Sequence, residues 1–142
     1  WLKHIEKAFQ NPKVMAAYGP VYLLDGPWWL KFFGNIGYTL FLWIGHLMGK
    51  PNLSGQNSAV RKFAYDKVGG FNLKLTTAED VDLGLRIKKE CGKVKYIQRM
   101  KVHTSARRLL AYGIWRFLAH HIKNYFNIIF RGKASDNFEP IR

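Results

Sequence analysis

The chain has 142 residues, enough for one domain or part of one, and its 48% hydrophobic and 15% aromatic content excludes a highly charged disordered protein. Lys and Arg number 23 against 9 Asp and Glu, and the net charge of +14 favours polyanionic partners: nucleic acid, an anionic lipid surface or a phosphorylated substrate. A single cysteine, Cys91, excludes an internal disulfide framework.

The first quarter of the chain predicts a helix followed by two short strands. Apolar residues recur with helical spacing over residues 1–9, and the Asn-Pro pair at 11–12 ends that helix. The stretch KVMAAYGPVYLL then predicts two extended runs, broken at Gly19 and Pro20.

Residues 27–51 form a long apolar segment whose charged residues are Lys31 and Lys50. Its length makes a membrane span conceivable, because about 18 to 20 residues are needed. Glycines at 34, 37 and 45, together with Asn35 and His46, weaken both a helix and insertion into a bilayer. The pattern favours a buried or interface-lying helix over a span or irregular packing.

The middle of the chain predicts two helices separated by a glycine turn. Residues 52–57 are expected to form a loop or short strand, and a helix is expected from Ala59 to about Val68, stopped by the glycines at 69 and 70. In TTAEDVDLGLR, Thr77 is expected to cap the next helix, with Asp80 completing a capping box. Gly92 is expected to end it.

The last third predicts a strand and an amphipathic helix. Residues 93–108 read as a strand with a basic outer face. A helix from Leu109 to Phe130 is expected to carry its apolar residues along one face, and a polar tail follows it.

Three carboxylates, Glu79, Asp80 and Asp82, open the helix at residue 79 in a chain that is otherwise strongly basic. One interpretation is that they complement the helix dipole, which is worth a few tenths to about 1 kcal/mol each. The other is a general base. Because residues one or two apart on a helix point in different directions, the pattern favours one carboxylate acting alone over a shared metal site.

Two further segments could meet phosphates or other ligands. In HTSARR, hydroxyls and the paired guanidiniums of Arg107 and Arg108 suit phosphate oxygens, although paired Arg residues are also common on solvated surfaces. SGQNSAVR offers small residues ahead of a helix but lacks the spacing of a phosphate-binding P-loop. The five histidines make no zinc pattern.

Three stretches taken in order, GQNSAVRKFAYDKVGGFN, TAEDVDLGLRIKKECGKVKYI and VHTSARR, resemble the second half of the family 2 glycosyltransferases. These are inverting enzymes with a GT-A fold, and the resemblance runs from about Gly55 to Arg108. It implies an α/β fold in which residues 1–108 form the C-terminal part of a Rossmann-like nucleotide-diphospho-sugar transferase domain. Residues 109–142 would form the amphipathic helix and polar tail, and the N-terminal nucleotide-binding part would be absent.

The resemblance also implies roles for individual residues. Asp80 matches the family's catalytic base, which takes the proton of the acceptor hydroxyl, and Glu79 is its motif partner. The resemblance implies that Gly55 and Asn57 line the donor or acceptor cleft. It implies that Arg107 and Arg108 meet the leaving diphosphate. Asp82 is a further implied substrate-binding residue, and its role is undecided.

The resemblance implies a divalent cation, Mg²⁺ or Mn²⁺, whose ligands would lie mostly upstream of residue 1. The chain is therefore expected to be an inactive fragment of a longer enzyme. The implied partners are a nucleotide-sugar donor and a sugar, lipid-phosphate or other hydroxyl acceptor, with no nucleic acid. The basic and aromatic segments suggest a peripheral position on the cytoplasmic face of an anionic membrane. Two rival hypotheses remain: a nucleic-acid-binding module and a noncatalytic membrane-associated domain.

Overall fold

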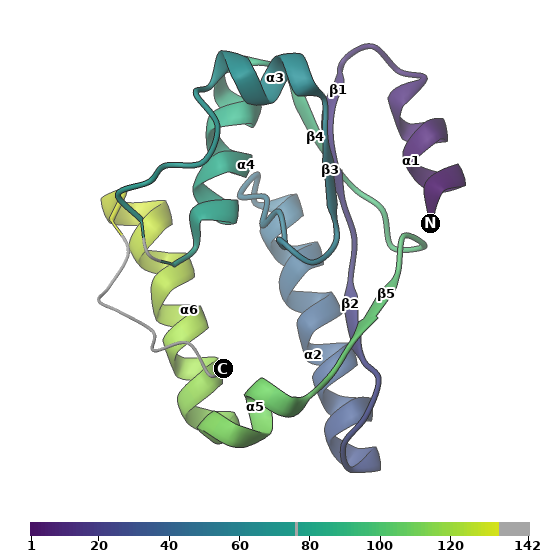
Figure 1. The fold of residues 1–142 in the computed structure, drawn as a ribbon, viewed down its shortest axis with the longest axis vertical. Coiled ribbons are helices and arrows are strands. Elements are labelled where there is room, and N and C mark those ends of the chain that lie inside the picture. The colour runs from purple at the N-terminus through teal and green to yellow at the C-terminus, as the bar shows by residue number, and fades with distance from the viewer. Residues whose placement is uncertain (76, 134–142) are drawn as a thin grey trace.

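The computed structural model describes residues 1–75 and 77–133 (Figure 1). In chain order its elements are α1 (Leu2–Phe9), β1 (Val14–Tyr18), β2 (Val21–Leu23), α2 (Trp28–Leu47), β3 (Ser58–Val60), α3 (Lys62–Lys67), α4 (Glu79–Glu90), β4 (Lys93–Tyr96), β5 (Val102–Thr104), α5 (Arg107–Tyr112) and α6 (Ile114–Arg131). The protein is a small α/β fold, as the sequence predicts at this coarse level.

The strands form two short sheets, and the chain passes directly from β1 in the first sheet to β2 in the second. The first has the order β3-β1-β4, in which β1 is antiparallel to β3 and parallel to β4. The second pairs β2 with β5 in parallel. Between β1 and β2 the chain passes so close to the carbonyl oxygens of Ile97 and Met100 that a side chain at Gly19 would overlap them. Glycine at this position therefore allows the chain to pass close to the backbone at residues 97 and 100.

Helices cover both sides of the central strand β1. In Figure 1, α1 lies on one side of β1, while α2 and α4 lie on the other. Every residue of β1 is buried, which fits its uncharged sequence VMAAY. The main core lies where β1, α2 and α4 meet, and its fully buried members include Ala16, Tyr18, Leu42, Leu53 and Ile87.

The segment that was predicted to form a helix from Ala59 to about Val68 has a different structure. Ala59 and Val60, predicted to begin a helix, lie in β3, where they pair with Ala17 and Ala16 of β1. The helix, α3, is shorter than predicted and spans Lys62–Lys67. Pairing with a buried strand outweighs the local helical pattern here, because it satisfies backbone groups and buries apolar side chains together.

The predicted capping box at the start of α4 is wrong. The residue at the N-cap is Ala78, which has a left-handed backbone (φ 58°), and no side chain caps this end of the helix. The Thr77 hydroxyl is buried and has no hydrogen-bond partner among the described residues. A left-handed backbone at a non-glycine residue costs about 1 kcal/mol or more, so the turn before α4 is strained.

The C-terminal part contains more breaks than the sequence pattern predicts. The single strand expected over 93–108 is divided into β4 and β5, which belong to different sheets. The single helix expected from 109 to 130 is divided at Gly113, whose φ of 80° ends α5 before α6 begins. Residues 134–142 of the predicted polar tail lie outside the described residues.

The predicted boundary at residue 108 stays a prediction, and α6 packs directly on the preceding part of the chain. Tyr125 and Ile128 of α6 form a second apolar cluster with Val81 of α4, and Phe41 of α2 packs against it. The Tyr125 hydroxyl also donates a hydrogen bond of 2.7 Å to the carbonyl oxygen of Lys50. The second half of α6 is therefore held by both α2 and α4.

The apolar segment at 27–51 forms a helix, α2, as favoured from its sequence. None of the helices within the described ranges combines the length and hydropathy that crossing a bilayer requires.

Candidate functional site

The structure brings together two of the predicted site residues, Asp80 and Gly55. Asp80 lies in the first turn of α4, and Gly55 lies in the loop between α2 and β3. The backbone N–H of Gly55 donates a hydrogen bond of 2.8 Å to Oδ2 of Asp80. The backbone N–H of Val81 donates to the other carboxylate oxygen, also at 2.8 Å. The loop before β3 and the first turn of α4 together fix the orientation of the Asp80 carboxylate.

The environment of Asp80 favours its protonated form relative to a carboxyl group in water. Burial raises the pKa of Asp80 above its ordinary value of 3.8, and the neighbouring negative charge of Glu79 raises it further. The hydrogen bonds from Gly55 and Val81 lower the pKa and so oppose this shift in part. A carboxylate with a raised pKa is a stronger proton acceptor once it is ionised.

A tyrosine on α2 is a third member of this group, and the sequence analysis did not identify it. Burial raises the pKa of Tyr38 to about 12, a hydrogen bond with Ser54 lowers it, and the charge of Asp80 raises it. The Tyr38 hydroxyl therefore stays protonated at neutral pH near the carboxylate. A hydroxyl inside an otherwise apolar run was the available sequence signal, but only the packing of α2 beside the 52–57 loop relates it to Asp80.

Glu79 and Asp82 lie on the same helix as Asp80 but face different surroundings. Glu79 is exposed. Asp82 accepts a hydrogen bond of 2.8 Å from Nε of Arg86, one helical turn later, and the two form an ion pair. The geometry thus gives Asp82 an internal partner, and its predicted contact with substrate stays a prediction.

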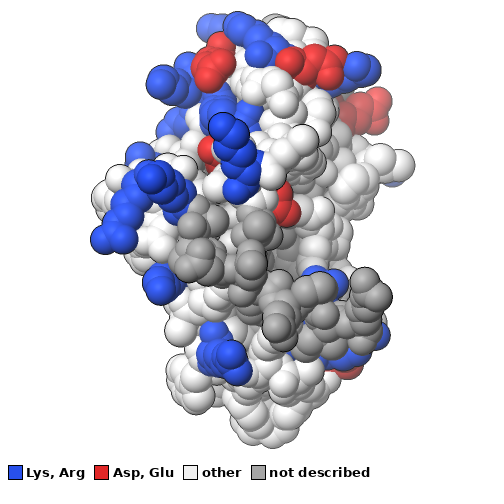
Figure 2. Space-filling model, turned by 60° about the vertical axis from the view of Figure 1, so that its left-hand side comes forward, with Lys and Arg blue, Asp and Glu red and all other residues white. Residues whose placement is uncertain are grey.

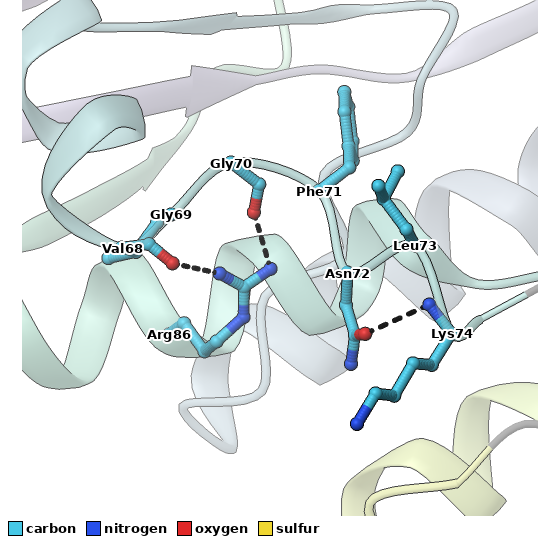
Figure 3. Close-up of a pocket in the computed structure, with 8 residues that line it drawn as sticks. All are labelled: Val68, Gly69, Gly70, Phe71, Asn72, Leu73, Lys74 and Arg86. Atoms are coloured by element: carbon cyan, nitrogen blue, oxygen red, sulfur yellow. Dashed lines mark hydrogen bonds between the residues drawn. The ribbon is translucent and has the colours of Figure 1, made fainter.

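Arg86 connects α4 to the glycine turn that follows α3. Its two terminal nitrogens donate to the carbonyl oxygens of Val68 and Gly70, at 2.6 and 2.8 Å (Figure 3). The open pocket beside it has a volume of about 370 Å³ and is lined by residues 68–74 and Arg86. Because the guanidinium is used by two carbonyls and Asp82, it stabilises this wall and has little capacity left for a ligand.

Asn57 also has a structural environment, because its side chain is fully buried and fully hydrogen-bonded. Its Nδ2 donates to the carbonyl oxygens of Pro20 and Met100, at 2.9 and 2.6 Å. Its Oδ1 accepts a bond of 2.8 Å from Nε1 of Trp1. The amide therefore joins the N-terminus, the β1 to β2 connection and the loop before β5.

Arg107 and Arg108 lie away from Asp80. Both are exposed and occupy the first turn of α5. Figure 1 places α5 at the lower end of the molecule, whereas α4 begins near mid-height beside the second half of α6. The structure thus brings Gly55 and Asp80 together and leaves the arginine pair in a different region.

The described residues contain no group of acidic, His or Cys side chains that could hold the implied divalent cation by itself. Within residues 1–75 and 77–133 no three His, Cys, Asp or Glu side chains cluster as metal ligands. Asp80 already accepts two backbone N–H groups, and Asp82 is paired with Arg86.

No family model matches the chain, and searches of curated proteins and of solved structures found no match. The resemblance to family 2 glycosyltransferases therefore stays a prediction that the motif residues carry.

A substitution at Gly55 tests the electrostatics of this site. Gly55→Pro removes the N–H that donates to Asp80, and since that hydrogen bond lowers the pKa of Asp80, the pKa is expected to rise. A carbon-detected NMR titration of the Asp80 carboxyl measures the change. Gly55→Ala is the matched control, because it keeps the N–H and its added methyl group would lie 3.6 Å from Oδ2 of Asp80, an ordinary contact. Equal titration of all three proteins would contradict the role given to this hydrogen bond.

Proposed function

We propose that the chain is the C-terminal half of a GT-A glycosyltransferase domain that transfers a sugar from a nucleotide-sugar donor with inversion of configuration. The observation that carries the proposal is the environment of Asp80. Its carboxylate is held by the Gly55 N–H, lies at the start of α4, and has a pKa raised by burial. An acid that only complements the helix dipole from a solvated surface would also lie at the start of the helix, but it would need neither the hydrogen bond from Gly55 nor the burial.

Asp80 is the proposed general base of this reaction. The acceptor hydroxyl oxygen forms a bond to the anomeric carbon of the donor sugar on the face opposite the diphosphate. The bond from that carbon to the diphosphate oxygen breaks, and the nucleoside diphosphate leaves with the electron pair. Asp80 takes the proton of the acceptor hydroxyl as its oxygen becomes bonded to carbon. Attack from the opposite face inverts the anomeric configuration.

The strained turn before α4 supports this assignment of Asp80. Ala78 holds a left-handed backbone directly ahead of Glu79 and Asp80, and the Thr77 hydroxyl beside it is buried without a partner among the described residues. Backbone strain and unsatisfied polar groups concentrate at functional sites, where the surrounding structure compensates their cost. Glu79 is proposed as a neighbour that raises the pKa of the base and positions the acceptor.

The proposed acceptor is a sugar or a lipid-linked phosphate at the cytoplasmic face of a membrane, where the enzyme would bind peripherally. A net charge of +14 and the apolar surface of α2 support a position beside anionic lipid. The same apolar surface favours the second candidate function, a noncatalytic membrane-associated domain, in which the acids of α4 would have no chemical role.

The experiment that tests the proposal is a transfer assay on the full-length protein with a panel of nucleotide sugars. NMR of the product is expected to show an anomeric linkage inverted relative to the donor. A product with retained configuration would contradict the proposed single displacement. Absence of transfer with every donor, together with binding to vesicles, would favour the noncatalytic alternative.

A further inference from the structure

The outward side of α2 carries large apolar side chains that no described residue covers. Six exposed residues of its first four turns define what we call the α2 outer face: Trp28, Trp29, Phe32, Phe33, Ile36 and Leu40. At 100° per residue they fall within an arc of about 140°, and Lys31 lies outside that arc. A helix on a water-exposed surface normally places polar residues there, so this face requires a partner.

Helix α5 lies next to the start of α2, on the side of the buried Leu30. A methyl group at Gly26, just before α2, would lie 3.5 Å from Cβ of Ala106, 3.7 Å from Cδ2 of Leu30 and 3.9 Å from Cδ1 of Leu110. The loop before α2, its first turn and α5 therefore converge at the lower end of the molecule (Figure 1). Trp115, at the start of α6 directly after α5, is 84% exposed.

The charges at this end are mainly positive. Arg107 and Arg108 are exposed, and among residues 1–75 and 77–133 neither guanidinium has a carboxylate partner. The acid nearby, Asp25, accepts hydrogen bonds of 2.8 Å from the Ser105 hydroxyl and 2.6 Å from the Ala106 N–H. Those bonds lower the pKa of Asp25, so it stays charged and compensates one arginine at most.

The charged side chains are unevenly distributed over the surface seen in Figure 2. Figure 2 shows most of the Lys and Arg side chains over the upper and middle parts of the face in view, and uncharged surface at its lowest end. Exposed apolar side chains on α2 with the exposed arginine pair of α5 nearby are the arrangement found where a helix lies flat in a membrane interface.

We propose that the α2 outer face, together with Arg107 and Arg108, docks the protein on the surface of an anionic lipid bilayer. The apolar side chains enter the boundary between headgroups and acyl chains, where Trp residues are favoured because their rings are amphipathic. The two guanidiniums then meet lipid phosphates, whose oxygens match their paired donors. The helix lies parallel to the membrane plane.

Charge favours a bilayer over a second copy of this chain as the occupant. A symmetric dimer through the α2 outer face would place the same patch of each copy against the other. Two copies that each carry a net charge of +14 repel one another, whichever way their α2 helices align. An anionic bilayer supplies the opposite charge over the whole contact.

The inference extends the membrane position proposed above, and vesicle binding measures it without any transfer reaction. Failure of docking and failure of catalysis are therefore separately observable. It also gives Arg107 and Arg108 a role that fits their separation from Asp80, since lipid phosphates would bind at the end of the molecule opposite α3.

The test is flotation of the protein with vesicles of phosphatidylcholine mixed with phosphatidylglycerol, compared with vesicles of phosphatidylcholine alone. The parent protein is expected to bind the anionic vesicles and to lose binding as salt is raised. Replacing both Arg107 and Arg108 with Gln is expected to weaken binding about 25-fold, at about fivefold for each cation. Phe33→Ser is expected to weaken it by about tenfold or more, because one buried aromatic side chain is lost.

Matched controls separate docking from general charge and hydrophobicity. Phe63 of α3 is 56% exposed, close to the 64% of Phe33, but lies away from the α2 outer face, so Phe63→Ser is expected to leave binding unchanged. Replacing the exposed Lys93 and Lys95 of β4 with Gln removes the same charge elsewhere and is expected to have a smaller effect. The proposal is overturned if the parent does not bind anionic vesicles or if each control weakens binding as much as its counterpart. Self-association that Phe33→Ser abolishes, without vesicle binding, would instead identify a second copy as the occupant.

Discussion

Replacing Asp80 with Asn is expected to reduce sugar transfer by the full-length protein by about 10²-fold to 10⁴-fold, the range that a general base contributes. The amide keeps the shape of the side chain and an oxygen that accepts from the Gly55 N–H, but it does not take a proton from the acceptor hydroxyl. Binding of the nucleotide sugar is expected to change little. Transfer rates under saturating donor, together with donor affinity from calorimetry, measure the two effects separately.

The same substitution is expected to remove the contribution of Asp80 to the pH dependence of stability. The pKa of Asp80 is raised in the folded protein, so the folded state holds the proton more tightly than the unfolded state. The free energy of unfolding therefore falls as the pH rises from the pKa of Asp80 in the unfolded chain to its pKa in the folded protein. Above both values Asp80 is charged, and the folded protein has lost this contribution to its stability. An uncharged Asn avoids this pH-dependent loss, although its NH₂ group replaces the oxygen that accepts from Val81. Urea unfolding at several pH values measures the change and distinguishes lost chemistry from lost folding.

Asp66→Asn is the matched control for Asp80→Asn. Asp66 forms an exposed ion pair with Lys62, a type of pair that contributes little to stability. The control is expected to keep both transfer rate and unfolding midpoint near those of the parent. Transfer by Asp80→Asn at the parent rate would show that Asp80 is not the base.

Replacing Asn57 with Ala is expected to lower the free energy of unfolding by about 3 kcal/mol, since each buried polar group left without a partner costs about 1 to 3 kcal/mol. The change leaves the carbonyl oxygen of Met100 without its donor, removes one of two donors from that of Pro20, and removes the acceptor of the Trp1 ring N–H. Chemical denaturation with urea measures the loss as a lower midpoint.

Asn72→Ala provides the comparison for Asn57→Ala. The Asn72 side chain accepts one bond, from the Lys74 N–H, in the loop shown in Figure 3, so its loss is expected to cost much less. The pair also tests the predicted substrate role of Asn57. A residue that contacts substrate would raise KM when replaced and leave the unfolding midpoint unchanged, the reverse of the result expected here.

The sequence predicted those elements whose signals are local. The helix at residues 2–9, the buried strand β1 and the helix in the apolar segment 27–51 were all expected, because periodicity and the breakers around them lie within each segment. The misplaced helix at 59–68 shows the limit. Ala59 and Val60 are compatible with a helix, and their strand structure depends on β1, more than forty positions earlier in the chain.

The candidate site was predictable only in part for a similar reason. Asp80 and Gly55 were identified from motifs, and the structure places them in direct contact. Tyr38 was missed because nothing in the local sequence relates it to Asp80. The separation of Arg107 from Asp80 was missed because the sequence does not reveal where the chain turns after β5, and the break at Gly113 sets a different course for α6.

The position of β1 between β3 and β4 also determines the order in which the fold can be completed. Ala16 pairs with Val60 on one side and with Val94 on the other, so the central strand stays unpaired until much of the chain has been synthesised. Contacts between such distant segments slow folding, because the loops that connect them must close before the contacts form. Until β4 has been synthesised, β1 exposes one unpaired strand edge with apolar side chains, and such edges are prone to aggregation.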